Sequence, residues 1–253
     1  MNVVVLVKSV VDPSGQPRLG PDFLMERSGE GTLDPGDEFA VEAALQLTTD
    51  GGTVTAISMG PEGAAPALRR ALAMGANGAV LVCDPALRGA DTLVTARVLA
   101  AAARQAGFDL VLAGVESADG YTGTLPMAIA ELLDVPSATF ARKVEVREGI
   151  VRIERQTETG YEVVECELPA VATVTAGATE PRYPTLKGIM ASRSKPLEQR
   201  TAADLGLDAA AITPTQRVQA ATPEPAKSGG VVIEAGEDTA ARIADALADA
   251  GVI

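Results

Sequence analysis

Short apolar runs alternate with longer helical stretches along the first half of the chain, and this alternation limits its possible folds more than any other feature. The runs are strand-length and rich in Val and Ile: Val3–Val7, Thr53–Met59, Ala79–Cys83 and Asp109–Gly114. Strands that are apolar on both sides are typical of a parallel sheet covered on both faces. The helical stretches between them are Asp37–Thr49, Glu62–Met74 and Asp91–Ala106. This order predicts right-handed βαβ crossovers and an α/β fold with a doubly wound, mostly parallel sheet.

Residues with capping chemistry mark the ends of these helices. Asp37 and Asp91 are suited to the N-cap position, and Gly75 and Gly107 stand where the helices should stop. The nearby carboxylates of Asp34 and Asp37 could suggest acid–base chemistry or a Mg²⁺ site. A cap explains Asp37 better, so we predict neither a catalytic residue nor a metal site there.

The pattern changes after about residue 140. Alternating charged and apolar residues predict a small antiparallel ribbon over Lys143–Val146, Val151–Gln156 and Tyr161–Glu167. A buried strand is predicted at Pro169–Thr175. The remaining sequence predicts an extended arm, with a linker at Thr213–Gly230, a short strand at Val231–Ile233 and a final helix at Asp238–Ala250. We therefore expect an α/β domain over residues 1–179, a separate loop over 180–200 and a C-terminal arm over 201–253.

Composition excludes several classes of function. The chain has no histidine, which removes imidazole bases and His-rich zinc sites, and Cys83 and Cys166 are too far apart in sequence for a C-x-x-C pair. A net charge of −13 disfavours binding to nucleic acid or anionic lipid. The run Val3–Val7 is too short for a membrane span or a secretory leader. We expect a cytoplasmic protein without a transmembrane segment.

The loop Gly114–Gly123 is the most informative of the loops that should follow the strands. Ligands of open parallel sheets bind beyond the carboxyl ends of the strands, where we expect Lys8–Pro13, Gly60–Gly63, Asp84–Gly89 and Gly114–Gly123. The last contains three glycines and the hydroxyl of Thr122, with Thr124 just beyond it. The following helix, Met127–Leu133 with Pro126 in its first turn, would present free N–H groups to an anion. A nucleotide or phosphate site and an ordinary strand-to-helix turn explain this loop equally well.

A basic and apolar segment, Glu180–Arg200, contrasts with the acidic chain, since it carries five Lys or Arg residues against two Glu. Its Tyr183, Leu186, Ile189 and Met190 stand among prolines and cations, a combination typical of protein-binding surfaces. The cations would attract an acidic partner. The alternative is a connection packed on the core.

Together these segments resemble the electron-transfer flavoprotein β subunit family. Glu180–Met190, with the sequence EPRYPTLKGIM, closely resembles the docking loop of that family. Further matches are Leu33–Pro35, Ala40–Ala44, Ala71–Ala76, Asp119–Gly120 and parts of Ile153–Val171. They run in register from Val3 to about Gly206. The resemblance implies a Rossmann-like fold of the adenine nucleotide α-hydrolase type.

The resemblance also implies a subunit without a catalytic site, bound to an α subunit that holds most of the FAD, while β buries a structural AMP. The implied AMP contacts are Leu6, Asp34, Pro35, Gly36, Asp37, Met59, Gly114, Val115, Glu116, Ser117, Ala118, Asp119, Gly120, Tyr121, Thr122, Gly123, Thr124 and Leu125. The implied docking residues are Arg182, Tyr183, Leu186, Ile189 and Met190, with Leu186 inserted into an apolar pocket of an acyl-CoA dehydrogenase. Electrons would pass from such donors of fatty acid oxidation toward a quinone oxidoreductase, and the arm 201–253 would contact the α subunit.

The chain departs from the family pattern at several positions. AMP-binding relatives commonly carry Gln-Thr-Gly-Gln in the nucleotide loop. Electron-bifurcating relatives, which oxidise NADH and hold a second FAD in place of AMP, tend to carry Asp-Gly-Asp-Thr. Tyr121 occupies the second Asp position, so the loop matches neither group, and we favour AMP. Gln156 replaces a Glu that often contacts the flavin domain, and Ala191–Lys195 replaces a run of lysines.

A stand-alone adenine-nucleotide-binding module of the stress-protein type is the alternative from another class. It explains the sheet and the loop Gly114–Gly123. It leaves the segment Glu180–Arg200 and the long tail without a use.

Overall fold

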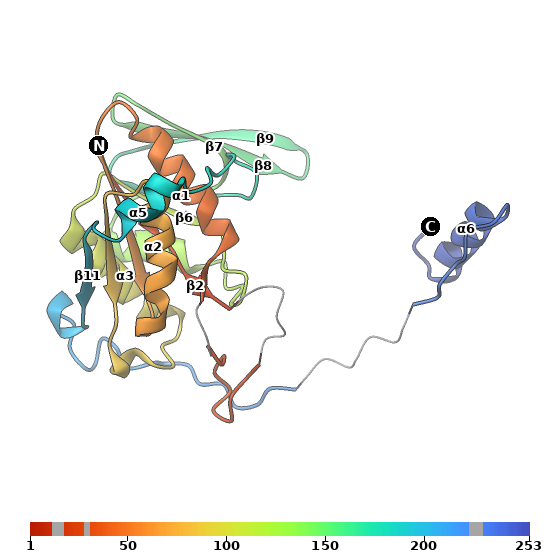
Figure 1. The fold of residues 1–253 in the computed structure, drawn as a ribbon, viewed down its shortest axis with the longest axis horizontal. Coiled ribbons are helices and arrows are strands. Elements are labelled where there is room, and N and C mark those ends of the chain that lie inside the picture. The colour runs from red at the N-terminus through yellow and green to blue at the C-terminus, as the bar shows by residue number, and fades with distance from the viewer. Residues whose placement is uncertain (12–17, 28–30, 223–229) are drawn as a thin grey trace. The chain divides into compact units, whose positions relative to one another are not determined.

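The computed structural model describes residues 1–11, 18–27, 31–222 and 230–253, which form two units, Met1–Val218 and Gln219–Ile253 (Figure 1). Each unit is described by itself. The end of the loop expected at Lys8–Pro13 and part of the linker expected at Thr213–Gly230 lie outside the described residues.

The first unit is built on a nine-stranded sheet with the order β11-β5-β4-β1-β6-β10-β7-β8-β9. The strands from β11 to β10 pair in parallel, and β10 also pairs in parallel with β7. Their bounds are β1 Asn2–Leu6, β4 Thr53–Met59, β5 Gly78–Val82, β6 Leu110–Gly114, β7 Ser137–Arg147, β8 Ile150–Thr157, β9 Gly160–Glu167, β10 Ala170–Val174 and β11 Leu197–Arg200. The predicted α/β fold with a mostly parallel sheet is confirmed.

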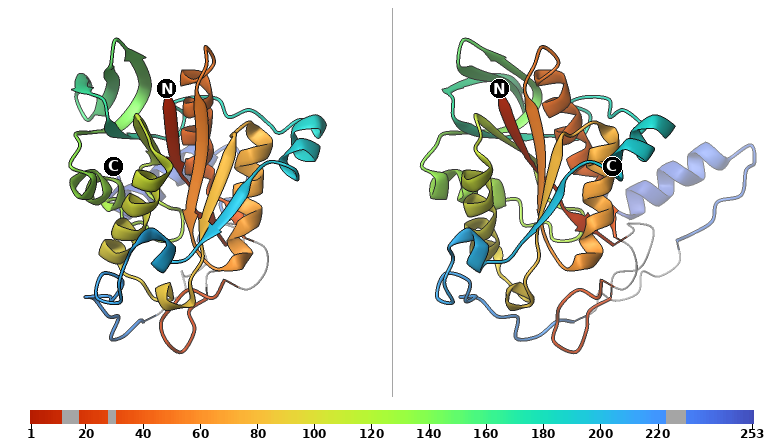
Figure 2. Two further views of the ribbon diagram at one scale, coloured as in Figure 1. Left: turned by 90° about the vertical axis from the view of Figure 1, so that its left-hand side faces the viewer. Right: turned by 60° about the vertical axis from the view of Figure 1, so that its left-hand side comes forward.

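Two layers of helices cover the parallel part of the sheet (Figure 2). Helices α1 (Pro35–Leu47) and α2 (Ala65–Met74) lie on one face, and α3 (Thr92–Ala106) and α4 (Leu125–Leu133) lie on the other. Short 3₁₀ turns η1 (Glu62–Ala64), η2 (Pro85–Leu87) and η3 (Ala203–Leu205) complete the connections.

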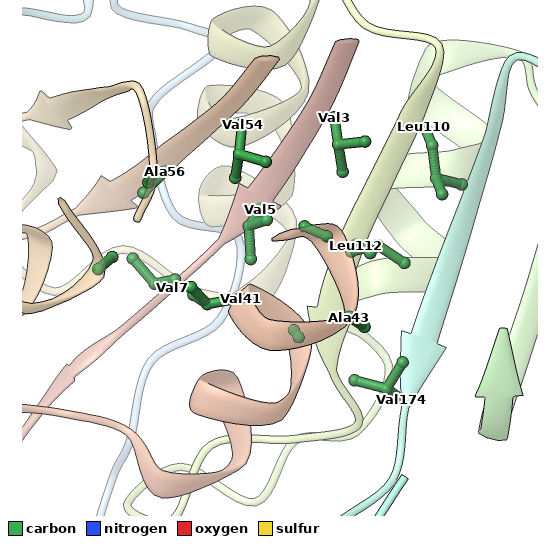
Figure 3. Close-up of a cluster of buried hydrophobic side chains, with 14 of the residues drawn as sticks. Val3, Val5, Val7, Val41, Ala43, Val54, Ala56, Leu110, Leu112 and Val174 are labelled. Carbon is green, nitrogen blue, oxygen red and sulfur yellow. The ribbon is translucent and has the colours of Figure 1, made fainter. Parts of the chain in front are cut away.

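Side chains of β1 alternate between the two cores, which is why the strand is apolar throughout. Val3 and Val5 face the α1 layer, where Figure 3 shows them beside Val41 and Leu110, and Val4 and Leu6 pack with the α3 layer. The continuous apolar runs therefore predicted the correct kind of strand.

The predicted cap of the first helix is wrong. Asp34, not Asp37, is the N-cap of α1, and its carboxylate accepts a hydrogen bond from the Gly36 N–H. Pro35 then occupies the first helical position, for which its ring is already in the required conformation. Asp37 consequently lies inside the first turn and is buried. Asp91, Gly75 and Gly107 cap their helices as predicted.

The antiparallel ribbon is present, and it continues the main sheet. Strand β7 pairs in parallel with β10 through Ala141 and then antiparallel with β8, which pairs in turn with β9. The pairing register shifts at this junction, and Phe140 has a φ of 61° there. A separate two-stranded antiparallel sheet joins β2 (Ser9–Val10) to β3 (Thr32–Leu33).

The segment expected as a loop over 180–200 contains a helix, α5 (Leu186–Ser192), and the edge strand β11. Strand β11 is largely polar and short, so sequence periodicity gives little sign of it, and its pairing with β5 brings it into the sheet. Residues 201–218, expected to begin the arm, belong to the first unit.

In the second unit, the final helix is confirmed as α6 (Thr239–Asp249). The strand predicted at Val231–Ile233 is wrong, because these residues pair with no strand in the described part of the chain. No described helix combines the length and apolar character needed to cross a membrane.

Candidate functional site

The sheet reverses its direction of growth at β1. The chain adds β4 and β5 on one side of β1 and then returns to place β6 on its other side. Such a switch point leaves a crevice beyond the carboxyl ends of the two diverging strands, and open α/β sheets bind their ligands there. The loops that follow β1 and β6 begin with Val7 and Val115, and Lys8 is the second residue of the first loop.

Asp34 joins the start of α1 to the loop after β6. One carboxylate oxygen accepts the Gly36 N–H at 2.8 Å, and the other accepts the Ala118 N–H at 2.7 Å. The side chain is buried. A single carboxylate therefore caps the helix and fixes the backbone of the glycine-rich loop.

Asp37 joins α1 to the two strand ends. Its Oδ2 accepts the Lys8 N–H at 2.7 Å, and the Gly114 N–H is a further donor. Burial raises the pKa of Asp37 well above its ordinary value, the nearby Asp34 charge adds to the rise, and the N–H donors do not cancel it.

Position 114 requires glycine, because the start of α1 packs directly against its backbone. A Cβ at this position would lie 2.9 Å from Asp37 Oδ1 and 3.3 Å from the Gly36 carbonyl carbon. The absence of a side chain at Gly114 therefore lets the start of α1 approach the end of β6.

Two cations that the sequence did not single out meet at the loop. Lys8 Nζ lies 2.6 Å from Asp119 Oδ1 and 3.0 Å from Ser117 Oγ, and Arg27 lies 2.6 Å from Asp119 Oδ2. Burial raises the pKa of Asp119, but its hydrogen bonds and charge interactions with Lys8 and Arg27 outweigh this, so the net pKa is lowered. Lys8 could have been found because it follows β1 at the switch point, whereas no local signal marks Arg27.

The far end of the loop is open to solvent. Tyr121 is 69% exposed with a φ of 47°, and Gly123 has a φ of 67°. Thr124 is the N-cap residue of α4, yet its side chain makes no capping hydrogen bond. The first N–H groups of α4 therefore lack a side-chain cap and remain suited to an anion.

Leu6 and Met59 end the neighbouring strands β1 and β4 and pack toward the α3 layer. The structure thus brings all the predicted nucleotide contacts to one edge of the sheet. Asp34 and Asp37 contact the glycine-rich loop directly, whereas no described hydrogen bond joins Leu6 or Met59 to it. Beside Met59, the hydroxyl of Ser58 is buried without a hydrogen-bond partner among the described residues.

These features fit a ligand that carries a phosphate, such as a nucleotide. The uncapped helix start offers N–H groups to a phosphate, and the half-buried Met59 at the end of β4 adds apolar surface at the same edge of the sheet. Within the described ranges, no three His, Cys, Asp or Glu side chains gather to hold a metal ion.

The predicted docking residues lie on a second, separate surface. Tyr183 is 87% exposed, Leu186 76% and Met190 66%, and Arg182 and Ile189 are also exposed. Leu186 begins α5, which Thr185 caps through the Gly188 N–H. The apolar side chains of this segment are therefore available to a partner.

Comparison with known proteins agrees with this arrangement. A family model described as the electron transfer flavoprotein domain matches residues 22–205. The chain belongs to the electron transfer flavoprotein family, as a β subunit. The electron transfer flavoprotein subunit beta of Mycobacterium tuberculosis is 40% identical over 241 residues, covering 90% of this chain and 91% of the relative.

Two further β subunits are similar over nearly the same span. That of Thermoanaerobacterium thermosaccharolyticum is 38% identical over 91% of this chain and 92% of its own length. That of Bacillus subtilis is 35% identical over 92% of each chain. An electron transfer flavoprotein β subunit is an electron carrier component with an α subunit as its partner.

Proposed function

We propose that this β subunit holds a structural AMP at the switch point of its sheet, while its α partner makes most of the contacts to the redox FAD. Electrons enter the heterodimer from acyl-CoA dehydrogenase-type flavoenzymes and leave toward a quinone oxidoreductase. The FAD supplies the electron transfer. The β subunit contributes binding and orientation and performs no bond chemistry of its own.

The observation that carries the AMP proposal is the loop Gly114–Leu125, which Asp34 and Asp37 hold against β1 beside an uncapped helix start. Backbone N–H groups suffice to bind a phosphate, so the acidity of the chain is no obstacle. The side chain of Asp119 is already engaged by Lys8 and Arg27.

The exposed apolar segment around α5 supports the docking proposal. Tyr183, Leu186 and Met190 would be a liability in an isolated protein, because contiguous apolar surface favours association. A stand-alone nucleotide-binding module gives this surface no role, whereas a subunit that docks on dehydrogenases uses it.

Quantifying the nucleotides released from the denatured, purified heterodimer tests the proposal. We expect AMP and FAD in equal amounts, since β offers one nucleotide site at its switch point. Two FAD per heterodimer and no AMP would contradict the AMP assignment and identify the electron-bifurcating alternative.

A further inference from the structure

Glu42 is a buried carboxylate on α1 that lies outside the nucleotide site. Its hydrogen bonds join it to Arg182 of the segment Glu180–Arg200 and to Gln46 of its own helix. The residue is only 4% exposed. Its Oε2 accepts Arg182 Nε at 2.7 Å and the Arg182 backbone N–H at 3.2 Å. Its Oε1 accepts the second Arg182 nitrogen at 2.9 Å and Gln46 Nε2 at 2.9 Å. Both oxygens are therefore fully occupied.

This pairing has the geometry that fixes a backbone as well as a side chain. The guanidinium binds the carboxylate in a bidentate manner, which sets its orientation. The additional bond to the Arg182 backbone N–H fixes the main chain just before the exposed residues of the docking segment, which we define as residues 180–192. Burial alone would raise the pKa of Glu42, but Arg182 and Gln46 lower it, so the carboxylate is charged and the pair is maintained at neutral pH.

The same segment is held at its other end by α2. Arg69 donates to the carbonyls of Ser192 at 2.6 Å and Lys195 at 3.0 Å, and Lys195 Nζ donates to the carbonyls of Leu72 and Ala76. Between the two anchors, Tyr183, Leu186 and Met190 remain exposed. Figure 1 shows α5 beside α1 and α2, the two helices that supply these anchors.

We propose that Glu42 is a positioning residue for docking: by holding Arg182, it presents Leu186 to the dehydrogenase in a fixed geometry. This inference rests on the proposed docking role of Leu186. An ordered segment loses less conformational entropy on binding than a mobile one, so preorganisation increases affinity without adding a contact.

Three variants of the heterodimer test this inference: Glu42→Gln, Leu186→Ala and their combination. The rate of flavin reduction by a purified acyl-CoA dehydrogenase and its acyl-CoA is followed against heterodimer concentration. We expect Glu42→Gln to raise KM by about tenfold, equivalent to about 1.4 kcal/mol, with kcat nearly unchanged. The double variant should be no worse than Leu186→Ala, because Glu42 acts through that side chain.

Glu38→Gln is the matched control. Glu38 lies one turn earlier on α1 and forms an ion pair with Arg70 of α2, so the change removes an ion pair of the same helix without touching the docking segment. Its KM should equal that of the wild type. Nucleotide content and flavin spectrum should be unchanged in every variant, which excludes a general loss of folding.

Trypsin supplies a readout independent of electron transfer. A guanidinium held by Glu42 cannot enter the protease's specificity pocket, so Glu42→Gln should accelerate cleavage after Arg182 by about tenfold, as expected when local opening becomes that much more populated. Glu38→Gln should not change this rate. If Glu42→Gln fails to fold, Glu42→Asp, which keeps the charge but is too short for the bidentate geometry, should raise KM and cleavage after Arg182 in the same direction.

The outcomes separate the two proposals. If Leu186→Ala raises KM while Glu42→Gln does not, the positioning role is wrong and docking stands. If the effects of Glu42→Gln and Leu186→Ala are additive, Glu42 acts by another route and the inference also fails. If Leu186→Ala changes nothing, the docking assignment itself is wrong.

Discussion

At the scale of single residues, the switch point depends on two groups that tolerate little change, Gly114 and Asp37. The carboxyl of Asp37 is buried and accepts backbone N–H groups from both strand ends. Its pKa is raised in the folded state, so the folded protein binds this proton more tightly than the unfolded chain does. Its contribution to stability is therefore complete at low pH and is lost as the pH rises through the raised pKa.

Replacing Gly114 with Ala should disrupt this packing. The new Cβ would meet Asp37 Oδ1 at 2.9 Å, and the carboxyl is held by its hydrogen bonds, so the loop must move. We expect a loss of about 1–3 kcal/mol in the free energy of unfolding and a clear drop in co-purified nucleotide. Denaturant titration and nucleotide quantification measure the two effects.

Gly63→Ala is the control for this change. A Cβ at Gly63 meets nothing within 4 Å, although the residue also lies, within η1, in the connection that follows a strand of the same sheet. Gly63→Ala should leave the free energy of unfolding and the amount of co-purified nucleotide near wild-type values. Equal nucleotide content in the two variants would refute the requirement for glycine at position 114.

At the scale of elements, α1 serves both functional surfaces. Its N-terminus holds the nucleotide loop through Asp34 and Asp37, and its middle holds the docking segment through Glu42. The apolar side of the same helix packs on β1 and β6 (Figure 3). Because one helix makes all these contacts, the two surfaces are fixed relative to the same sheet.

Asp34→Ser separates capping from positioning of the loop. Serine is a good N-cap, but its single hydroxyl oxygen cannot replace both carboxylate oxygens at Gly36 and Ala118. We expect the free energy of unfolding to fall by about 1 kcal/mol or less, which would appear as a small drop in melting temperature. Nucleotide retention on gel filtration should fall markedly.

Asp91→Ser is the matched control. Asp91 caps α3 through the Val94 N–H, and its second oxygen accepts the Thr215 N–H, so the substitution removes an equivalent pair of contacts without touching the nucleotide loop. Nucleotide retention should not change. If both variants release nucleotide equally, the loss reflects general destabilisation and the positioning role of Asp34 is wrong.

At the scale of the whole molecule, none of the described residues of the second unit is buried. Helix α6 contains no buried residue, and its Ile243 and Leu247 lie on one side at helical spacing. An amphipathic helix of this kind is stabilised by packing against another surface. We propose that this surface is the α subunit, as the family resemblance implies for the arm.

Charging the apolar side of α6 should weaken the heterodimer. We expect Ile243→Asp combined with Leu247→Asp to raise the Kd for α by at least about tenfold, because each side chain contributes about 1.5 kcal/mol or more when fully buried. Ala241→Asp combined with Ala248→Asp introduces the same charge on the opposite side and should have little effect. Equal Kd values for the two variants, measured by titration with isolated α, would exclude this helix side from the interface.

The sequence by itself determined the parallel sheet and the position of the glycine-rich loop at the carboxyl ends of its strands. Apolar runs such as Val3–Val7 are signals of short range, because burial on both faces requires every residue of a central strand to be apolar. The glycine-rich loop and the docking segment also carry short-range signals, because their glycines, prolines and apolar residues lie close together in sequence.

Only the tertiary structure decided which distant polar groups meet. Asp34 holds a loop that lies 84 positions away, and Glu42 holds Arg182 across 140 positions. Asp37, interpreted from the sequence as a cap, proved to be the buried link between two strand ends. Strand β11 likewise depends on its partner β5. Local patterns report burial and turns, whereas long-range hydrogen bonds depend on which elements the sheet order places side by side.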